Sequence, residues 1–220
     1  MEFNYAREYT LKRNRDRVID LGAAGSFNAV VPAISDNPDT MDIDGAIYTA
    51  IHTIHASNAK RIFTAFHSHQ VPEILVIIWN GFPFYPHIEE GGDFMLQTMH
   101  DDSRVRHLII DNTMVRSNWL NEKMKRYLSD AWHPGLIQLG LKSFCHLQAL
   151  SFLGGHSFHE FAQLVSESIS DIAGTLGRPP FSYYPIETAD TSAGNTLDHS
   201  MRMASLSKAM RIIRETAQPD

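Results

Sequence analysis

The chain has 220 residues, of which 43% are hydrophobic and 20% are charged, and its formal net charge is −6. This length fits one domain of good size, or one domain with extensions, and the negative charge argues against broad nucleic-acid binding, which needs a basic face. The single cysteine, Cys145, cannot form an intrachain disulfide, so we expect a cytoplasmic protein. No apolar run approaches the length needed to span a membrane.

The first 57 residues are predicted to form an N-terminal helical extension. Residues 35–44 (SDNPDTMDID) are acidic and rich in turn-forming residues, which indicates a solvated loop. The apolar residues that follow recur at helical spacing and predict a helix over residues 43–55, capped by Asp42 or Asp44. These apolar residues are Ile43, Ile47, Ala50, Ile51 and Ile54.

The stretch from Ile62 to Phe82 is predicted to be a β-hairpin that opens the main domain. An extended run over residues 62–67 is followed by a turn near residues 70–72 and by an apolar run over residues 73–79. The second run carries Ile and Val on both faces, which is typical of a strand buried on both sides.

Helices and strands are predicted to alternate after this hairpin. A helix around residues 94–99 precedes a strand over residues 105–111, and a helix that Ser117 caps ends before Pro134. A strand over residues 142–147 leads to an amphipathic helix over residues 158–172. Residues 181–184 are expected to form an edge strand, because Pro185 argues against a central one.

This order predicts an α/β domain over residues 58–190. Alternating strands and helices indicate parallel strands, and the hairpin adds an antiparallel edge. We therefore expect a mixed four- or five-stranded sheet with helices mainly on one face. Residues 191–220 are predicted to be a C-terminal amphipathic helix that docks on the domain or on a second subunit.

Several residues of this domain match a known family pattern. They are the run Trp79 to Phe82 (WNGF), Asp111, Trp119, Pro134 and Gly140. With them, residues 58–190 resemble the small STAS-like domain proteins of bacteria, which are fold relatives of anti-sigma-factor antagonists. The resemblance implies regulation or ligand sensing rather than chemistry. It also implies a phosphorylation switch at Ser117, although the family's Asp-Ser-Ser-Gly signature is replaced here by residues 116–119 (RSNW).

The candidate binding site lies where the predicted strand over residues 105–111 ends. Asp111 stands at the carboxyl edge of the sheet, where open α/β folds place their sites. Asp111, Asn112, Ser117, Trp79 and His146 are predicted to line a small pocket. The alternative is that Asp111 only caps the following turn.

Two other kinds of site remain open. Gly155, Ser157 and their neighbours partly match the nucleophile elbow of α/β-hydrolases, with His159 in place of the closing glycine. A serine hydrolase would need Asp171 or Asp190 and His199 as partners; otherwise Ser157 caps the helix that follows. The twelve histidines include close pairs, but none completes a known ligand set, so no metal or other cofactor is predicted.

The sequence thus favours a non-enzymatic bacterial regulatory or sensing protein that binds a protein partner or a small ligand. The flanking helical segments are compatible with a homodimer. A small serine hydrolase that uses Ser157 and a histidine metal-binding protein are the alternatives.

Overall fold

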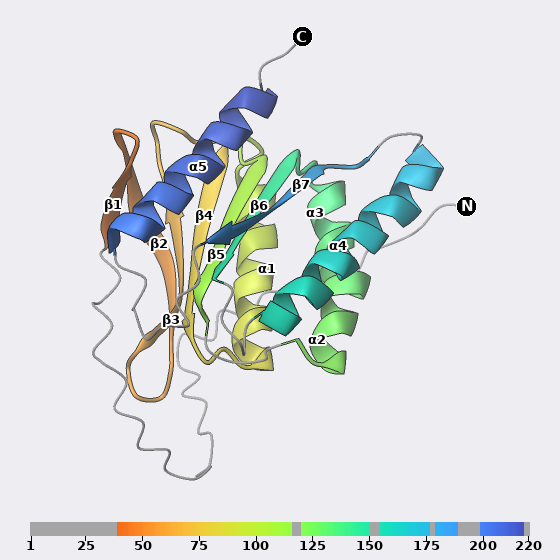
Figure 1. Cartoon of the computed structure of the whole chain (residues 1–220), viewed down its shortest axis with the longest axis horizontal. Coiled ribbons are helices and arrows are strands. Elements are labelled where there is room, and N and C mark those ends of the chain that lie inside the picture. Colours follow the sequence, from red (N-terminus) through yellow and green to blue (C-terminus); the bar gives the residue numbers. More distant parts are fainter. Residues whose placement is uncertain (1–38, 116–119, 150–154, 177–178, 189–198, 218–220) are drawn as a thin grey trace.

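Seven strands of the described chain pair in the order of the sequence and form one mixed sheet that curls into a half-barrel (Figure 1). The computed structural model describes residues 39–115, 120–149, 155–176, 179–188 and 199–217. The strands are β1 (Thr40–Ile43), β2 (Ala46–His55), β3 (Arg61–His67), β4 (Ile74–Gly81), β5 (His107–Val115), β6 (Ser143–Ala149) and β7 (Ser182–Thr188).

The sheet is antiparallel from β1 to β4 and parallel from β4 to β7. Each parallel pair is joined through helices. These are α1 (Tyr85–Asp101), then α2 (Glu122–Tyr127), the π-helix η1 (Leu128–Trp132) and α3 (His133–Gln138), then α4 (Gly155–Leu176). Because crossovers of one hand advance in one direction along the sheet, these helices cover the same face. The last helix, α5 (His199–Ala217), covers the other face (Figure 1).

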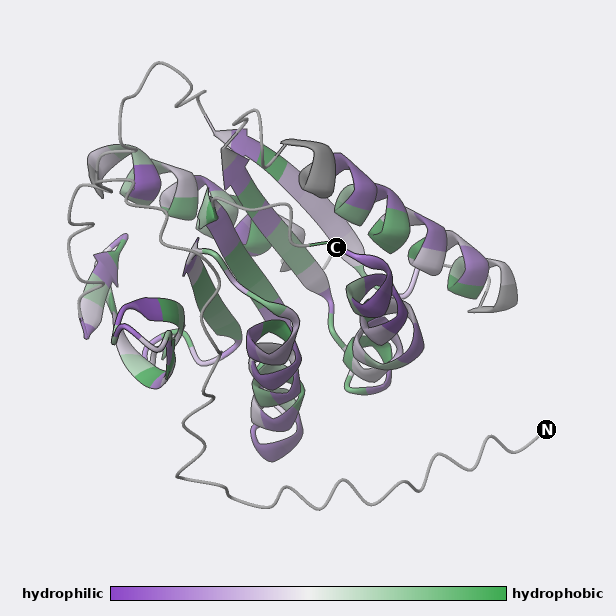
Figure 2. Cartoon of the chain, turned by 90° about the horizontal axis from the view of Figure 1, so that it is seen from below, coloured by the Kyte–Doolittle hydropathy of each residue, from purple (hydrophilic) through white to green (hydrophobic). Residues whose placement is uncertain are grey.

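The sheet therefore separates two hydrophobic cores. On β4, Leu75, Ile77 and Trp79 face the crossover helices, in what we call the crossover core. Ile74, Val76 and Ile78 face α5, in the α5 core. Both sets are almost fully buried, as alternation along a central strand requires. Figure 2 shows hydrophobic residues concentrated on the central strands between the two helical layers.

The expected four- or five-stranded STAS-like sheet is wrong, because the described chain forms seven strands. The additional strands β1 and β2 lie in residues 40–55, which were expected to be a loop and a helix. Asp44 and Gly45 join them with φ angles of 53° and 83°. Two central residues with positive φ define the type I′ hairpin turn, for which Asp-Gly is a preferred pair.

The helical spacing in residues 43–55 has a structural cause within β2. The register of β2 against β3 shifts between Ala50 and His52, so the strand holds a bulge. The side chains of Ile47 and Ile51 are 49% and 46% exposed. Tyr48 is buried in the α5 core, whereas Ile54 is buried in the crossover core. The expected helical extension over residues 1–57 is therefore wrong for residues 40–55, and residues 1–38 lie outside the described residues.

Two further expectations, the hairpin and the edge strand, are confirmed, and the expected end of one helix needs correction. The hairpin of β3 and β4 is confirmed, as is the edge strand, which β7 extends through Pro185. The helix expected to end before Pro134 continues through it, because η1 loosens the backbone there and the His133 N–H bonds to the Leu128 carbonyl. No helix among the described residues is long and apolar enough to span a bilayer.

We predict that Leu206→Ala, on the buried side of α5, lowers the free energy of unfolding by about 2–5 kcal/mol. Leu206 is fully buried in the α5 core, so truncation leaves a cavity. Met201→Ala on the same helix is the control, because Met201 is 40% exposed. Urea unfolding followed by circular dichroism measures both changes. Equal losses for the two variants would contradict the packing of α5 on the sheet.

Candidate functional site

The candidate site is built around a bulge near the carboxyl end of β5. Ile78 and Asn80 of β4 pair with Asp111 and Met114 of β5, so β5 carries one residue more than β4 between these pairs. Bulges of this kind aim side chains and are frequent next to functional sites. Here Asp111 and Asn112 are consecutive, and they point to opposite faces of the sheet.

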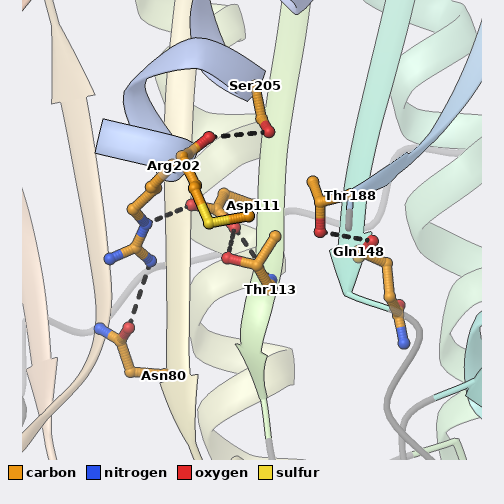
Figure 3. Close-up of polar contacts among 8 residues, drawn as sticks. Asn80, Asp111, Thr113, Gln148, Thr188, Arg202 and Ser205 are labelled. Carbon is orange, nitrogen blue, oxygen red and sulfur yellow. Dashed lines mark hydrogen bonds and ion pairs between the residues drawn. The ribbon is translucent and has the colours of Figure 1, made fainter. Parts of the chain in front are cut away.

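Asp111 faces α5 and forms an ion pair there (Figure 3). Its Oδ2 atom lies 2.5 Å from Nε of Arg202, and its Oδ1 atom accepts hydrogen bonds from the hydroxyl and the backbone N–H of Thr113. Arg202 also donates to Oδ1 of Asn80 at 3.3 Å. Asp111 is fully buried and the Arg202 side chain is 13% exposed. A buried carboxylate needs such partners, so this contact ties the start of α5 to the centre of the sheet.

Asn112 faces the crossover helices and contacts His146 of β6. Its amide nitrogen lies 2.8 Å from Nε2 of His146, and Nδ1 of His146 lies 3.2 Å from the hydroxyl of Tyr183 on β7. Because the Asn112 amide nitrogen donates, Nε2 accepts and the imidazole proton resides on Nδ1. Burial lowers the pKa of His146 to about 3, so the ring is neutral near pH 7.

A cavity of about 40 Å³ lies between this face of the sheet and the crossover helices. Its fourteen lining residues are mostly apolar and aromatic, and among them only Tyr127 is partly exposed. They are Trp79, Pro83, Ile88, Gly92, Met95, Ile110, Asn112, Val115, Tyr127, Leu128, Trp132, Phe144, His146 and Phe161.

Two buried polar atoms of this lining have no hydrogen-bond partner among the described residues. They are Oδ1 of Asn112, an acceptor, and Nε1 of Trp132, a donor. Asn112 is 7% exposed and Trp132 is 2% exposed. Unpaired buried polar groups are rare in native proteins and each calls for a structural reason. We call this feature the Asn112–Trp132 cavity.

The π-helix η1 is the element that carries Trp132 to the cavity wall. It spans Leu128–Trp132, between α2 and α3. The α2 helix starts after Asn121, whose side chain accepts from the backbone N–H groups of Lys123 and Met124. Trp132 follows Leu128 at i+4 spacing, and both are buried in the crossover core. Short π-helices are frequent at functional sites.

The structure brings together three of the five predicted site residues. Trp79, Asn112 and His146 all line the cavity, whereas Asp111 contacts Arg202 of α5 on the other side of the sheet. Ser117 lies outside the described residues, and the cap of α2 is Asn121. The sequence interpretation missed Trp132, although it follows Leu128 at i+4 spacing. It also missed the pairing of Arg202 with Asp111, because a contact 91 positions apart leaves no periodic signal.

The described residues give little support to the serine-hydrolase and metal-site alternatives. Ser157 lies in the first turn of α4, but its side chain is outside the described part of the chain. Asp171 is on the same helix, about 21 Å farther along at 1.5 Å per residue, which is too far for a catalytic partner. Among the side chains that the structure describes, no group of three or more His, Cys, Asp or Glu residues is placed to hold a metal ion.

The fold and the cavity define this chain as an α/β protein with a mostly apolar pocket beside the parallel half of a mixed sheet. Comparison with protein-family models, with curated proteins and with solved structures finds no match. The resemblance to STAS-like proteins therefore has no support from relatives, and the seven-stranded sheet departs from that fold.

We predict that Arg202→Met lowers the free energy of unfolding by about 3–5 kcal/mol, because it leaves the buried Asp111 carboxylate without its cation. Adding Asp111→Asn to this variant removes the unpaired charge and restores part of the loss. Arg104→Met is the control, since Arg104 pairs with Asp102 at the surface, and we expect it to leave the unfolding midpoint nearly unchanged. Urea titration measures these three variants and Asp111→Asn alone. A double variant that loses the full sum of its single changes would contradict this coupling.

We also predict that acid destabilises the protein in part through His146. Between the ordinary histidine pKa of 6.5 and the folded-state value of about 3, the unfolded chain binds a proton that the folded chain does not. The free energy of unfolding therefore falls as the pH decreases through this window. Buried His133, whose pKa is lowered to about 4, acts in the same direction.

The contribution of His146 is the difference between the wild type and His146→Gln, which does not titrate. Urea unfolding at several pH values between 7 and 3 is expected to give a shallower pH dependence for the variant. Parallel curves for the two proteins would show that His146 is protonated in the folded state as readily as in the unfolded state.

Proposed function

We propose that this protein is a non-enzymatic sensing protein that binds a small organic molecule in the Asn112–Trp132 cavity. The observation that carries the proposal is the pair of polar atoms without a partner among the described residues, Asn112 Oδ1 and Trp132 Nε1, in a mostly apolar lining. A buried polar group without a partner costs about 1–3 kcal/mol. A ligand that pairs with both atoms removes that cost, and an apolar pocket with a few convergent polar groups is typical of small-molecule sites.

The state of His146 and Asp111 favours binding over catalysis. Both ring nitrogens of His146 are engaged, and its pKa of about 3 makes it a weak base near neutral pH. The Asp111 carboxylate is held by Arg202 and Thr113 on the opposite face of the sheet. Among the described lining residues, therefore, no side chain is set up as a general base for a molecule in the cavity.

A sensing role is supported by the position of the cavity on β5. Asn112 lines the cavity, and its chain neighbour Asp111 holds Arg202 of α5. A ligand that moves Asn112 would therefore act on the contact that anchors α5, and α5 is exposed to partners on its outer side. The protein partner, the homodimer and the phosphorylation of Ser117 stay predictions that no described contact tests.

The test is a screen of uncharged organic fragments by two-dimensional NMR of the uniformly ¹⁵N-labelled protein. We expect bound fragments to shift the indole N–H signal of Trp132 and the side-chain amide signals of Asn112. Ile110→Phe, which places a larger side chain in the lining, is expected to abolish the shifts. Leu206→Ala, on the opposite face, is expected to keep them.

The absence of any fragment that shifts the Trp132 signal would contradict the proposal. So would shifts that persist unchanged in Ile110→Phe, provided that thermal unfolding shows this variant to be folded. Extra volume in a packed core costs about 1–3 kcal/mol, so Leu206→Ala also serves as a control of similar instability.

A further inference from the structure

The lining of the Asn112–Trp132 cavity contains no charged side chain among its described residues. His146 is neutral, and the ion pair of Asp111 with Arg202 lies across the sheet. An ion that entered would lose its hydration without gaining a counter-ion, which is strongly unfavourable. The chemistry of the wall therefore selects an uncharged ligand.

The two atoms without partners also fix the direction of each hydrogen bond that a ligand can form with Asn112 and Trp132. The Asn112 amide nitrogen is engaged with Nε2 of His146, so the atom of Asn112 that is left without a partner is the oxygen. The Trp132 indole carries a single N–H and no acceptor. A ligand that satisfies both must therefore offer one donor, to Asn112, and one acceptor, to Trp132.

The size of the cavity limits how much of the ligand enters it. An engineered protein cavity of about 150 Å³ binds a benzene ring, whereas this one has about 40 Å³. That volume accepts a polar head of a few heavy atoms. The remainder of the ligand must extend toward Tyr127, the lining residue that is partly exposed, where Tyr127 and Trp79 offer aromatic surfaces to a ring.

We propose that the ligand is an uncharged carboxamide attached to an apolar or aromatic body. The amide N–H donates to Oδ1 of Asn112, and the amide carbonyl accepts from Nε1 of Trp132. This inference rests on the function proposed above and specifies its ligand class. A carboxamide presents its donor and its acceptor on two separate atoms without a charge, whereas a hydroxyl must use one oxygen for both.

The test compares benzamide, benzoate and toluene at pH 7 with the full chain. The three share a ring, but only benzamide is both neutral and able to donate and accept hydrogen bonds. Binding is measured by NMR titration of the Trp132 indole N–H signal, which is expected to move downfield when it donates to the amide carbonyl. We expect benzamide to bind at least tenfold more tightly than benzoate and than toluene.

Two outcomes separate this inference from the function on which it rests. If toluene binds in the cavity as well as benzamide does, or benzoate binds more tightly, the carboxamide class is overturned while the cavity remains a ligand site. If none of the three shifts the Trp132 signal but another neutral fragment does, the carboxamide class is likewise overturned. If no fragment does, the proposed function falls with it.

Variants assign the two hydrogen bonds. Trp132→Phe removes the donor and Asn112→Leu removes the acceptor, and each is expected to weaken benzamide binding about tenfold while leaving toluene binding nearly unchanged. Binding to both variants is followed at the backbone amide signals of the lining residues Ile110 and Phe144, because Trp132→Phe has no indole signal at this position. The comparison with toluene within each variant separates a lost hydrogen bond from a general loss of fold. Leu206→Ala is the control for instability and is expected to bind benzamide like the wild type. An equal loss for benzamide and toluene in both variants would overturn the assignment.

Discussion

The alternation of side chains along β5 is the constraint on which the rest of the structure depends. This strand is central to the sheet, and every one of its residues is buried. Polar groups near its carboxyl end must therefore find partners within the protein, and consecutive residues must find them on opposite faces. Asp111 has its cation in α5, whereas Asn112 has its partner in His146 of the neighbouring strand. One short segment thus requires both helical layers to be in place.

The two faces of the sheet differ in how fully the buried polar groups of β5 find hydrogen-bond partners. On the α5 face, both oxygens of Asp111 have donors within 2.9 Å. On the crossover face, the network is left incomplete at Asn112 and at Trp132. A sequence that specifies one structure usually satisfies all its buried polar groups, and departures concentrate at functional positions. The asymmetry between the faces is the reason to look for function in the cavity rather than at the ion pair.

Much of the central fold could be predicted from the sequence, because strands buried on both sides leave unmistakable apolar runs such as residues 74–79. The edge of the sheet was missed for an identifiable reason. The bulge near Ile51 places residues of both strand faces at intervals that imitate a helix, and the Asp44–Gly45 turn signal was read as a cap. Within the site, Trp79, Asn112 and His146 were predictable from their place at the strand ends. The separation of Asn112 from Asp111 was missed because the strand was expected to end at residue 111, whereas β5 continues to Val115 and alternation places these two residues on opposite faces.

The free edges of the half-barrel have a consequence for how this protein behaves in a crowded solution. An open sheet exposes two rows of backbone groups, each able to template the addition of a further strand and hence aggregation. Here the first edge, β1, has only four residues. The second, β7, carries Pro185, which has no N–H to offer to an incoming strand. Among the described residues, Pro185 therefore opposes the pairing of a further strand at this edge of the sheet.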